Sequence, residues 1–328
     1  MRHLLVIRLS ALGDAAILAP VLRRWAAANT DICFTVAAPA MLAPLFEGMP
    51  NVAFLGVDKK QPAHRIYRQM KTVGADAVAD IHQVAKVGRA LLLLRLDALM
   101  HLSPLTVKHL RKGRLSRFFM LRHWSMRPRR PQYERYSDVF RRLGLKEPAA
   151  NYPQPFHRPP ATPPVIGIAP FSQHEGKVWP FEYIDRLAAM LNDRGYRVLL
   201  FGSRQEAPQL DTLASSLANV TSLAGRLSFR DELEQIRNLT LMVSMDSANM
   251  HFASAVGTPV VSIWGATHPD FGFYGYGQAR ENALCAGLPC QPCSAYGQRP
   301  CRLKNHPCLH AVTPEQVFRH IETVISGH

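Results

Sequence analysis

An acidic residue close to the N-terminus stands where an α/β protein can place a catalytic carboxylate. An apolar strand is expected at residues 4–7, the turn at residues 8–14 ends in Asp14, and an amphipathic helix continues to about residue 28. Aspartate at the start of a helix often serves only as a cap. A carboxylate that faces a cleft can instead accept a proton from a hydroxyl group, as a general base does. The spacing leaves both roles open for Asp14.

Two later segments carry groups that suit a diphosphate. Lys177 comes just before a predicted helix, where it is either a solvated surface charge or a counter-charge for phosphate at the helix N-terminus. Residues 243–251 lead from a strand through small side chains into another helix, which frees backbone amides to bind an anion. In this segment Asp246 suits a sugar hydroxyl, whereas His251 is more typical of a buried core residue.

Two common nucleotide-binding motifs are missing from the sequence. The first strand-to-helix turn lacks G-x-G-x-x-G, and G-x-x-x-x-G-K-[ST] occurs nowhere in the 328 residues. Because these glycine-rich loops cradle phosphates in many nucleotide-binding proteins, a dinucleotide-dependent oxidoreductase and a P-loop NTPase are poor interpretations.

A cluster of cysteines lies near the C-terminus. Five of the six cysteines fall in the last 44 residues, where Cys290 and Cys293 form a C-x2-C pair that is followed by Cys301 and Cys308. Four thiolates can bind one zinc or iron ion tetrahedrally and leave no open position, so such a metal would be structural. Reduced thiols packed in a loop explain the same spacing, and both interpretations stay open.

The elements that must position these residues form two series of alternating strands and helices. In the first half, further strands are expected at residues 32–37, 52–57 and 77–80. In the second half, strands are expected at residues 165–169, 197–201, 241–243 and 260–264, with a helix at residues 181–193. Thr313 and Gln316 predict a capping box for a final helix. This alternation indicates parallel sheets, whose ligands bind at the carboxyl ends of the strands.

A proline-rich stretch separates the two series. Residues 151–164 contain six prolines and little apolar periodicity, as is typical of a linker. We therefore expect two Rossmann-like α/β domains that face a central cleft, with the boundary near residue 155. The first domain would comprise residues 1–155. The second would comprise residues 156–328, with the cysteine-rich loop and the final helix.

The charge of the chain is strongly positive and unevenly distributed. Lys and Arg number 39 against 24 Asp and Glu, a net charge of +15, and residues 86–135 hold thirteen cations but only two acids. Apolar side chains interleave with these cations at helical spacing: Leu115, Phe118, Phe119, Leu121 and Trp124. Such a segment suits an acidic, lipid-linked acceptor or an anionic membrane face, although an ordinary amphipathic helix also explains it. Arg111, Arg114 and Arg117 are the candidate acceptor contacts.

The apolar runs of the chain are short. None approaches the roughly 20 residues that a membrane span needs, and the apolar stretch before Arg8 is too short for a signal peptide. A cytoplasmic protein is therefore expected.

Together, the two halves resemble the GT-B glycosyltransferase architecture, and the motifs resemble those of the heptosyltransferases, glycosyltransferase family 9, which build the inner core of lipopolysaccharide. The matching segments are residues 8–14, 177–180, 223–225, 246–251, 257–261 and 264–269. They follow the family's order across nearly the whole chain. Where the family pattern has a glycine after its Asp-Ser/Thr pair, this chain has Ala248, which makes a left-handed backbone or a very close diphosphate contact harder there.

The resemblance implies an inverting, metal-independent transfer of a heptose or a related sugar. The second domain would bind the donor, an ADP-sugar and most simply ADP-heptose. The first domain would bind the acceptor, the lipopolysaccharide core, and would supply Asp14 as the general base. The implied donor-binding residues are Ser172, Lys177, Gly202, Gly225, Asp246, Ser247, Ala248, Asn249 and His251. On the acceptor side, Ser10 and Gly13 join the three arginines.

The resemblance also bears on cofactors and location. It implies that catalysis needs no cofactor. Some members of the family carry a similar cysteine cluster, which favours a structural zinc or iron at the four cysteines. From the substrate class we expect peripheral contact with the cytoplasmic face of the inner membrane, and no nucleic acid.

Two other functions remain as alternatives. A nucleic-acid-binding protein could use the basic segment, but no helix-turn-helix, RRM or zinc-finger signature supports it. A catalytically silent GT-B scaffold is the second alternative, and the presence of Asp14 and Lys177 argues against it.

Overall fold

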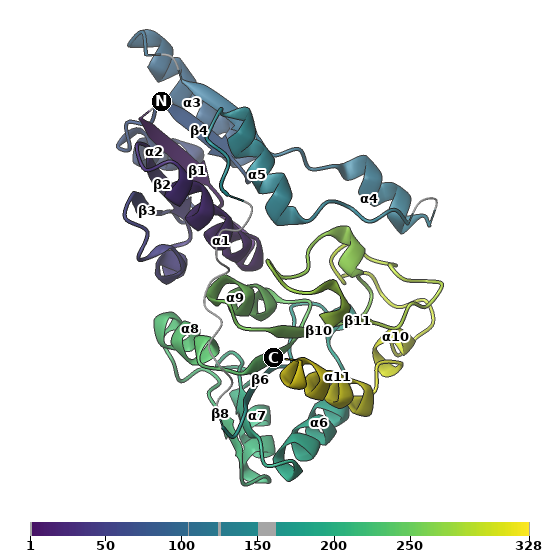
Figure 1. Cartoon of the computed structure of the whole chain (residues 1–328). Helices are drawn as coiled ribbons and strands as arrows, with labels where there is room; N and C mark the ends of the chain where they lie inside the picture. Colours follow the sequence, from purple (N-terminus) through teal and green to yellow (C-terminus); the bar gives the residue numbers. More distant parts are fainter. Residues whose placement is uncertain (1, 104, 124–125, 150–161, 328) are drawn as a thin grey trace. The chain divides into compact units, whose positions relative to one another are not determined.

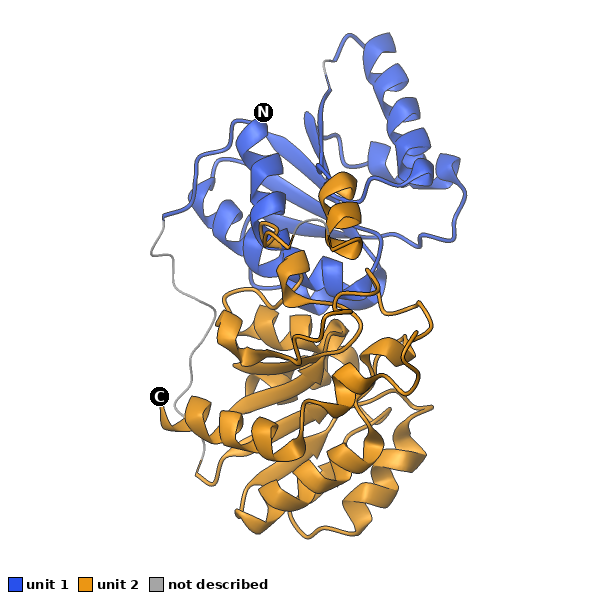
Figure 2. Cartoon of the chain, turned by 90° about the vertical axis from the view of Figure 1, so that its right-hand side faces the viewer, with its two compact units in different colours: residues 1–112, 132–153 blue, residues 113–131, 154–328 orange. Residues whose placement is uncertain are grey.

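The computed structural model describes residues 2–103, 105–123, 126–149 and 162–327, and it divides into two compact units (Figure 2). The first unit contains residues 1–112 and 132–153, and the second contains residues 113–131 and 154–328. Most of the predicted linker at residues 151–164, and with it the predicted domain boundary, lies outside the described residues, as does Trp124. Each unit is a parallel sheet with helices on its faces, as the alternation of strands and helices predicts (Figure 1).

The sheet of the first unit has five strands in the order β3-β2-β1-β4-β5. They are β1 (His3–Ile7), β2 (Cys33–Ala38), β3 (Val52–Gly56), β4 (Ala77–Asp80) and β5 (Thr106–His109). The helices of this unit are α1 (Leu12–Ala28), α2 (Ala63–Lys71), α3 (Ala85–Met100) and α5 (Gln132–Arg142), with a 3-10 segment η1 (Ala40–Phe46). The strand order reverses between β1 and β4, and the loops that follow these strands diverge there, which makes room for a site.

Helices pack on both faces of this sheet. Helix α1 packs on α5, where the rings of Trp25 and Phe140 lie 5.4 Å apart. Helices α2 and α3 pack together and cover the opposite face with a core that includes Ile66, Met70 and Leu91. The three central strands β1, β2 and β4 are almost entirely buried, so the carboxyl ends of β1 and β4 form a rigid edge for the loops that follow.

The sheet of the second unit has six strands in the order β11-β10-β9-β6-β7-β8. They are β6 (Val165–Ala169), β7 (Arg197–Leu200), β8 (Val220–Ser222), β9 (Leu241–Met245), β10 (Val260–Trp264) and β11 (Ala283–Cys285). The main helices are α6 (Phe181–Asp193), α7 (Ala207–Ser215), α8 (Phe229–Arg237), α9 (Ala248–Val256), α10 (Pro307–His310) and α11 (Pro314–Ser326). Three 3-10 segments complete the unit: η2 (Glu175–Lys177), η3 (Pro269–Phe271) and η4 (Arg280–Asn282). The order reverses between β6 and β9, which places a second diverging pair of loops at this edge.

Local signals mark the ends of helices in the second unit, and the capping box is the one that the sequence predicts. Helix α11 starts with the capping box of Thr313 and Gln316, and α9 ends at Gly257, which has a φ of +88°. Helices α6, α7 and α11 contribute Leu187, Leu210 and Ile321 to the main core of the unit. Helices α8 and α9 pack on each other, with Phe229 against Phe252.

Residues 113–131, which are part of the basic region, belong to the second unit. In the chain they precede α5, which belongs to the first unit. Residues 113–131 include α4 (Arg114–Leu121), where Arg117 donates to the Tyr296 hydroxyl and lies against the Phe273 ring, 5.8 Å from its centroid. The amide of Arg129 donates to the Asp270 carbonyl at 2.9 Å. The chain therefore passes between the two units more than once. Among the helices of the described residues, none has both the length and the apolar character of a membrane span.

Candidate active site

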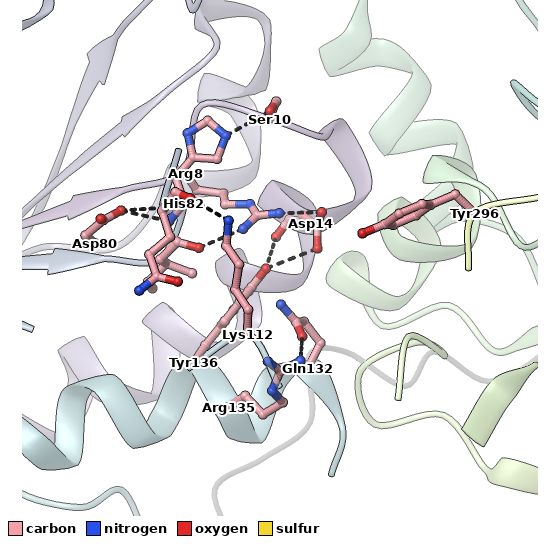
Figure 3. A network of polar contacts seen from close by, with 12 residues as sticks. Arg8, Ser10, Asp14, Asp80, His82, Lys112, Gln132, Arg135, Tyr136 and Tyr296 are labelled. Carbon is pink, nitrogen blue, oxygen red and sulfur yellow. Dashed lines mark hydrogen bonds and ion pairs between the residues drawn. The ribbon is translucent and has the colours of Figure 1, made fainter. Parts of the chain in front are cut away.

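The loops after β1 and β4 bring a polar cluster together in the first unit (Figure 3). Asp14 lies in the first turn of α1, but Ala11 is the N-cap residue, so the Asp14 side chain is not the helix cap. Its carboxylate forms an ion pair with Arg8 Nη2, and the Tyr136 hydroxyl donates to Asp14 Oδ1 at 3.3 Å. The Asp14 side chain is 22% exposed, so one side of the carboxylate can still reach a substrate.

Arg8 is the buried centre of this cluster. Its side chain is only 9% exposed, and Nη1 donates to the Ile81 carbonyl at 2.7 Å, which ties the loop after β1 to the loop after β4. Burial acts to lower the pKa of Arg8, but Tyr136 and Asp14 outweigh it, so the pKa is raised above its usual value. Burial also raises the pKa of Tyr136. At neutral pH, Asp14 therefore faces a guanidinium cation and a protonated phenol.

A histidine and a second aspartate support the same loops. His82 Nε2 lies 2.9 Å from Ser10 Oγ, and burial together with the nearby Arg8 cation lowers the pKa of His82 to about 4. His82 is consequently uncharged at neutral pH. Asp80 Oδ1 accepts from the backbone amides of His82, at 3.0 Å, and Gln83, at 2.8 Å, while Asp80 Oδ2 lies 2.9 Å from His109 Nδ1.

These supporting residues were not among the predicted site residues. Asp80 and His82 could have been found, because they stand at the end of the predicted strand at residues 77–80, at the edge where ligands bind. Tyr136 lies on α5, 122 residues from Asp14, and no local pattern connects the two.

The second unit assembles its own cluster from the loops after β6 and β9. Lys177 Nζ lies 2.8 Å from Asp246 Oδ2 and donates to the Asp246 carbonyl at 3.3 Å. Thr267, in the loop after β10, donates to the same carboxylate oxygen at 2.7 Å. Ser172 Oγ donates to the Asp246 carbonyl at 3.4 Å. The structure thus brings together Ser172, Lys177 and Asp246, three of the predicted donor-binding residues, and adds Thr267.

The first turn of α9 lies beside this cluster. Ser247 is the N-cap residue, but its side chain makes no capping hydrogen bond and lies 3.2 Å from Ser244 Oγ instead. The amides at the start of the helix, including those of Ala248 and Asn249, are therefore not capped by Ser247. Ala248 is absent from the described residues with positive φ, so alanine is compatible with this backbone. His251 is buried, with 7% of its surface exposed.

Three glycines shape the loops around this cluster. Gly225 has a φ of +64°, and a Cβ added at this position would lie 2.5 Å from the Arg204 Cα. The amide of Gly225 donates to the Gly202 carbonyl at 3.0 Å. A Cβ on Gly297 would lie 2.7 Å from Lys177 Cγ. Gly202 and Gly225 follow β7 and β8, so these predicted residues lie at the same edge of the sheet as Lys177 and Asp246.

The predicted acceptor residues divide between the units. Ser10, Gly13 and Arg111 lie in the first unit, and Ser10 and Gly13 belong to the loop and first turn beside Asp14. Arg114 and Arg117 lie in the second unit. Arg114 is exposed, whereas Arg117 contacts Tyr296 and Phe273. Among the described residues, Arg117 is therefore the only one of the three arginines whose side chain forms a hydrogen bond or a ring contact.

The four cysteines of the predicted metal site are free thiols near one another. Burial and the charges of Cys293, Cys290 and Cys301 raise the pKa of Cys308 to about 12, and burial raises the pKa of Cys293. Among the described residues, no group of three or more His, Cys, Asp or Glu side chains is placed to hold a metal ion. The thiols therefore do not have the geometry of ligands to one ion.

The fold and the two clusters define the class of this protein: two Rossmann-like α/β domains of the GT-B type, each with polar groups at the point where its strand order reverses. A model of glycosyltransferase family 9 (heptosyltransferase) matches residues 64–305, and the chain belongs to that family.

Similar proteins agree with this assignment. The lipooligosaccharide heptosyltransferase 2 of Haemophilus influenzae is 33% identical over 114 residues, so the match spans 33% of this chain and 33% of that protein. The structure of E. coli ADP-heptose lps heptosyltransferase II has a TM-score of 0.69 at 21% identity, covering 100% of this chain and 99% of that one. The structure of E. coli heptosyltransferase WaaC with ADP-2-deoxy-2-fluoro heptose has a TM-score of 0.65 at 19% identity, covering 98% and 99%. At these identities the structural likeness establishes the fold.

A more distant structural neighbour has the same fold. The iron-containing dodecameric glycosyltransferase TibC from enterotoxigenic E. coli has a TM-score of 0.59 at 16% identity, covering 99% of this chain and 77% of that one.

Proposed function

We propose that this protein transfers a heptose from ADP-heptose to an acceptor of the lipopolysaccharide core, with Asp14 as the general base. The observation that carries the proposal is the Asp14 carboxylate. Arg8 and Tyr136 hold it in place, yet it is part-exposed at the carboxyl edge of the sheet. The exposed side of the carboxylate can therefore reach the hydroxyl group of a substrate. Membership of the heptosyltransferase family supplies the reaction class.

The donor is proposed to bind at the cluster in the second unit. Lys177 and the amides at the start of α9 would hold the diphosphate, because a lysine cation and the positive end of a helix dipole both stabilise negative charge. Asp246 and Thr267 would keep Lys177 in position. The neighbouring structure that contains an ADP-heptose analogue supports an ADP-sugar as the donor class.

The proposed chemical step is a single displacement. Asp14 accepts the proton of the acceptor hydroxyl while its oxygen attacks the anomeric carbon of the heptose. The bond between that carbon and the diphosphate oxygen breaks on the opposite side, so ADP leaves with the bonding electrons and the anomeric configuration inverts. Positioned cations favour the departure because negative charge develops on the diphosphate as the bond breaks.

The acceptor is proposed to be anionic and attached to a membrane lipid. The thirteen cations at residues 86–135 match such an acceptor and the cytoplasmic face of the inner membrane. Ser10 and Gly13 would line the acceptor site beside Asp14, with Arg111 and Arg114 as further contacts.

The substitution Asp14→Asn tests the role of the base. The asparagine keeps the size of the side chain but does not accept the proton, so we expect transfer to fall by about 100-fold or more while ADP affinity stays unchanged. Transfer is measured by mass spectrometry with ADP-heptose and a core acceptor, and affinity by calorimetry with ADP. Asp31→Asn, at an exposed acid of the same unit, is the control. Turnover close to that of the unaltered protein in Asp14→Asn would contradict the assignment.

A thermal-shift series with ADP, UDP and GDP tests the donor class. Selective stabilisation by ADP that Lys177→Ala abolishes is the expected result. If only UDP or GDP stabilises the protein, the proposed fold and general base still stand, but ADP-heptose is not the donor. No response to any nucleotide would favour the scaffold, and salt-dependent binding to generic RNA would favour the nucleic-acid alternative.

A structural zinc or iron at Cys290, Cys293, Cys301 and Cys308 remains a proposal that is separate from catalysis. Together with burial, the other three thiols raise the pKa of Cys308, so all four lie near one another, and this proximity supports the proposed metal site. Binding would require the thiols to move into a tetrahedral arrangement and lose protons. We expect about one metal ion per chain by elemental analysis of protein purified without chelator. We expect none in Cys290→Ser/Cys293→Ser, and metal-free wild-type protein would refute the site.

A further inference from the structure

Helix α3 in the first unit is apolar on the side that faces away from the core. Val87, Ala90, Leu91 and Leu94 are buried against the sheet. On the opposite side, the apolar residues with exposed side chains are Leu92, Leu93, Leu96, Leu99 and Met100, and Leu102 just beyond the helix extends the set. Their exposure ranges from 37% at Leu93 to 90% at Leu102. We call these six residues the outer apolar face.

This concentration of exposed apolar surface is unusual within the molecule. Thirteen large apolar side chains of the described residues are exposed, and seven of them lie between residues 84 and 102. Single exposed leucines are normal on a protein surface, but a contiguous patch indicates a binding surface. A helix whose outward side is also largely apolar is normally covered on that side as well.

The charges beside the outer apolar face indicate what covers it. Arg89 and Arg95 are exposed and lie three or four residues from Leu92, Leu93 and Leu99, so they border the face. No ion pair involves either arginine among the described residues. Asp97 is the single acid of α3, and its Oδ1 lies 2.6 Å from the Nζ of Lys71, which belongs to α2.

We propose that the outer apolar face of α3 inserts into the interface of an anionic lipid bilayer and docks the protein on the membrane. Leucines would enter the boundary between headgroups and acyl chains, and Arg89 and Arg95 would contact lipid phosphates, as in amphipathic helices that lie in the interface plane. A second copy of this chain fits the face poorly, because a symmetric pair would bring arginines to arginines with no acid between them. The inference refines the proposed function, since it names the surface that would bring the enzyme to a lipid-linked acceptor.

Vesicle co-sedimentation of the full-length protein tests the proposal. The probes are vesicles of phosphatidylethanolamine with phosphatidylglycerol, and vesicles of phosphatidylcholine alone. We expect binding to the anionic vesicles, and we expect Leu92→Ser/Leu96→Ser/Leu99→Ser to weaken it by about tenfold or more. Arg89→Gln/Arg95→Gln should weaken binding to the anionic vesicles while leaving the weak binding to neutral vesicles unchanged.

Leu303→Ser is the matched control, because Leu303 is an equally exposed leucine, at 61%, in the second unit. Circular dichroism verifies that each variant is folded. Failure of the wild type to bind anionic vesicles, or equal binding by the triple variant, would overturn the proposal. So would a dimer of the wild type that becomes a monomer in the triple variant, since a second copy would then cover the face. Vesicle binding needs neither donor nor acceptor, so its result is separate from the test of heptosyl transfer.

Discussion

At the scale of single residues, the site of the first unit depends on buried charge. Arg8 is in contact with Asp14, the Ile81 carbonyl and the Tyr136 ring, so one side chain joins the loops after β1 and β4 to α5. Removing one partner of a buried ion pair leaves the other charge uncompensated, which costs more than a surface pair contributes. Two side chains therefore set the position of Asp14: Arg8 from the loop after β1 and Tyr136 from α5.

His82 should make the stability of the protein depend on pH. In the folded protein its pKa is about 4, while an unfolded histidine titrates near its usual 6.5. As pH falls from about 6.5 toward 4, the unfolded chain takes up a proton that the folded chain does not, so the free energy of unfolding falls by about 2–3 kcal/mol. Above pH 6.5 this contribution to stability is complete.

Urea unfolding at pH 7, 6 and 5 measures this effect. We expect His82→Gln to lose stability less steeply than the wild type as the pH falls, because the substituted side chain does not titrate. His64→Gln, at an exposed histidine, should keep the slope of the wild type. An unchanged slope in His82→Gln would show that His82 titrates normally in the folded protein.

At the scale of elements, the donor cluster depends on close packing between loops. Lys177 ends η2, and the backbone of Gly297 lies against its side chain, where a Cβ would be 2.7 Å from Lys177 Cγ. The Gly176 carbonyl accepts from the amide of Ala266 at 2.7 Å, which joins the loop after β6 to the loop after β10. The lysine thus has little space to leave Asp246.

A pair of glycine substitutions separates backbone strain from displacement of Lys177. Gly297 and Gly287 both have positive φ, +83° and +68°, but a Cβ on Gly287 meets nothing within 4 Å. Both Gly297→Ala and Gly287→Ala should lose about 1 kcal/mol of stability through the left-handed backbone. Only Gly297→Ala should also weaken ADP binding, by about tenfold, because it pushes Lys177 away from its position. Equal ADP affinity of the two variants by calorimetry would contradict this role of Gly297.

At the scale of the whole molecule, each compact unit is built from two separate stretches of the chain. Residues 113–131 pack with the second unit although α5, which follows them, belongs to the first. Helix α4 has eight residues, too few to be stable in water without tertiary contacts. Its contacts with Tyr296 and Phe273 through Arg117 therefore help to keep it folded.

Hydrogen exchange of two arginine variants tests this packing. Arg117→Ala should lower the protection of the α4 amides by about tenfold, because it removes the contacts with Tyr296 and Phe273. Arg114→Ala, on the same helix but exposed, should leave that protection unchanged. If both variants exchange like the wild type, α4 is held by other contacts and Arg117 is free for the acceptor.

The sequence alone determined the parallel α/β class, most strands and the carboxyl-edge position of Asp14, Lys177 and Asp246, because strand periodicity, capping boxes and strand-to-helix turns are local patterns. The strands β5, β8 and β11, which have three or four residues each, were not predicted. Only the tertiary structure decided that Arg8 and Tyr136 hold Asp14, that Thr267 shares Asp246 with Lys177, and that α3 leaves an apolar face outward. These features join residues far apart in the chain, and burial and long-range contact are properties of the packed fold.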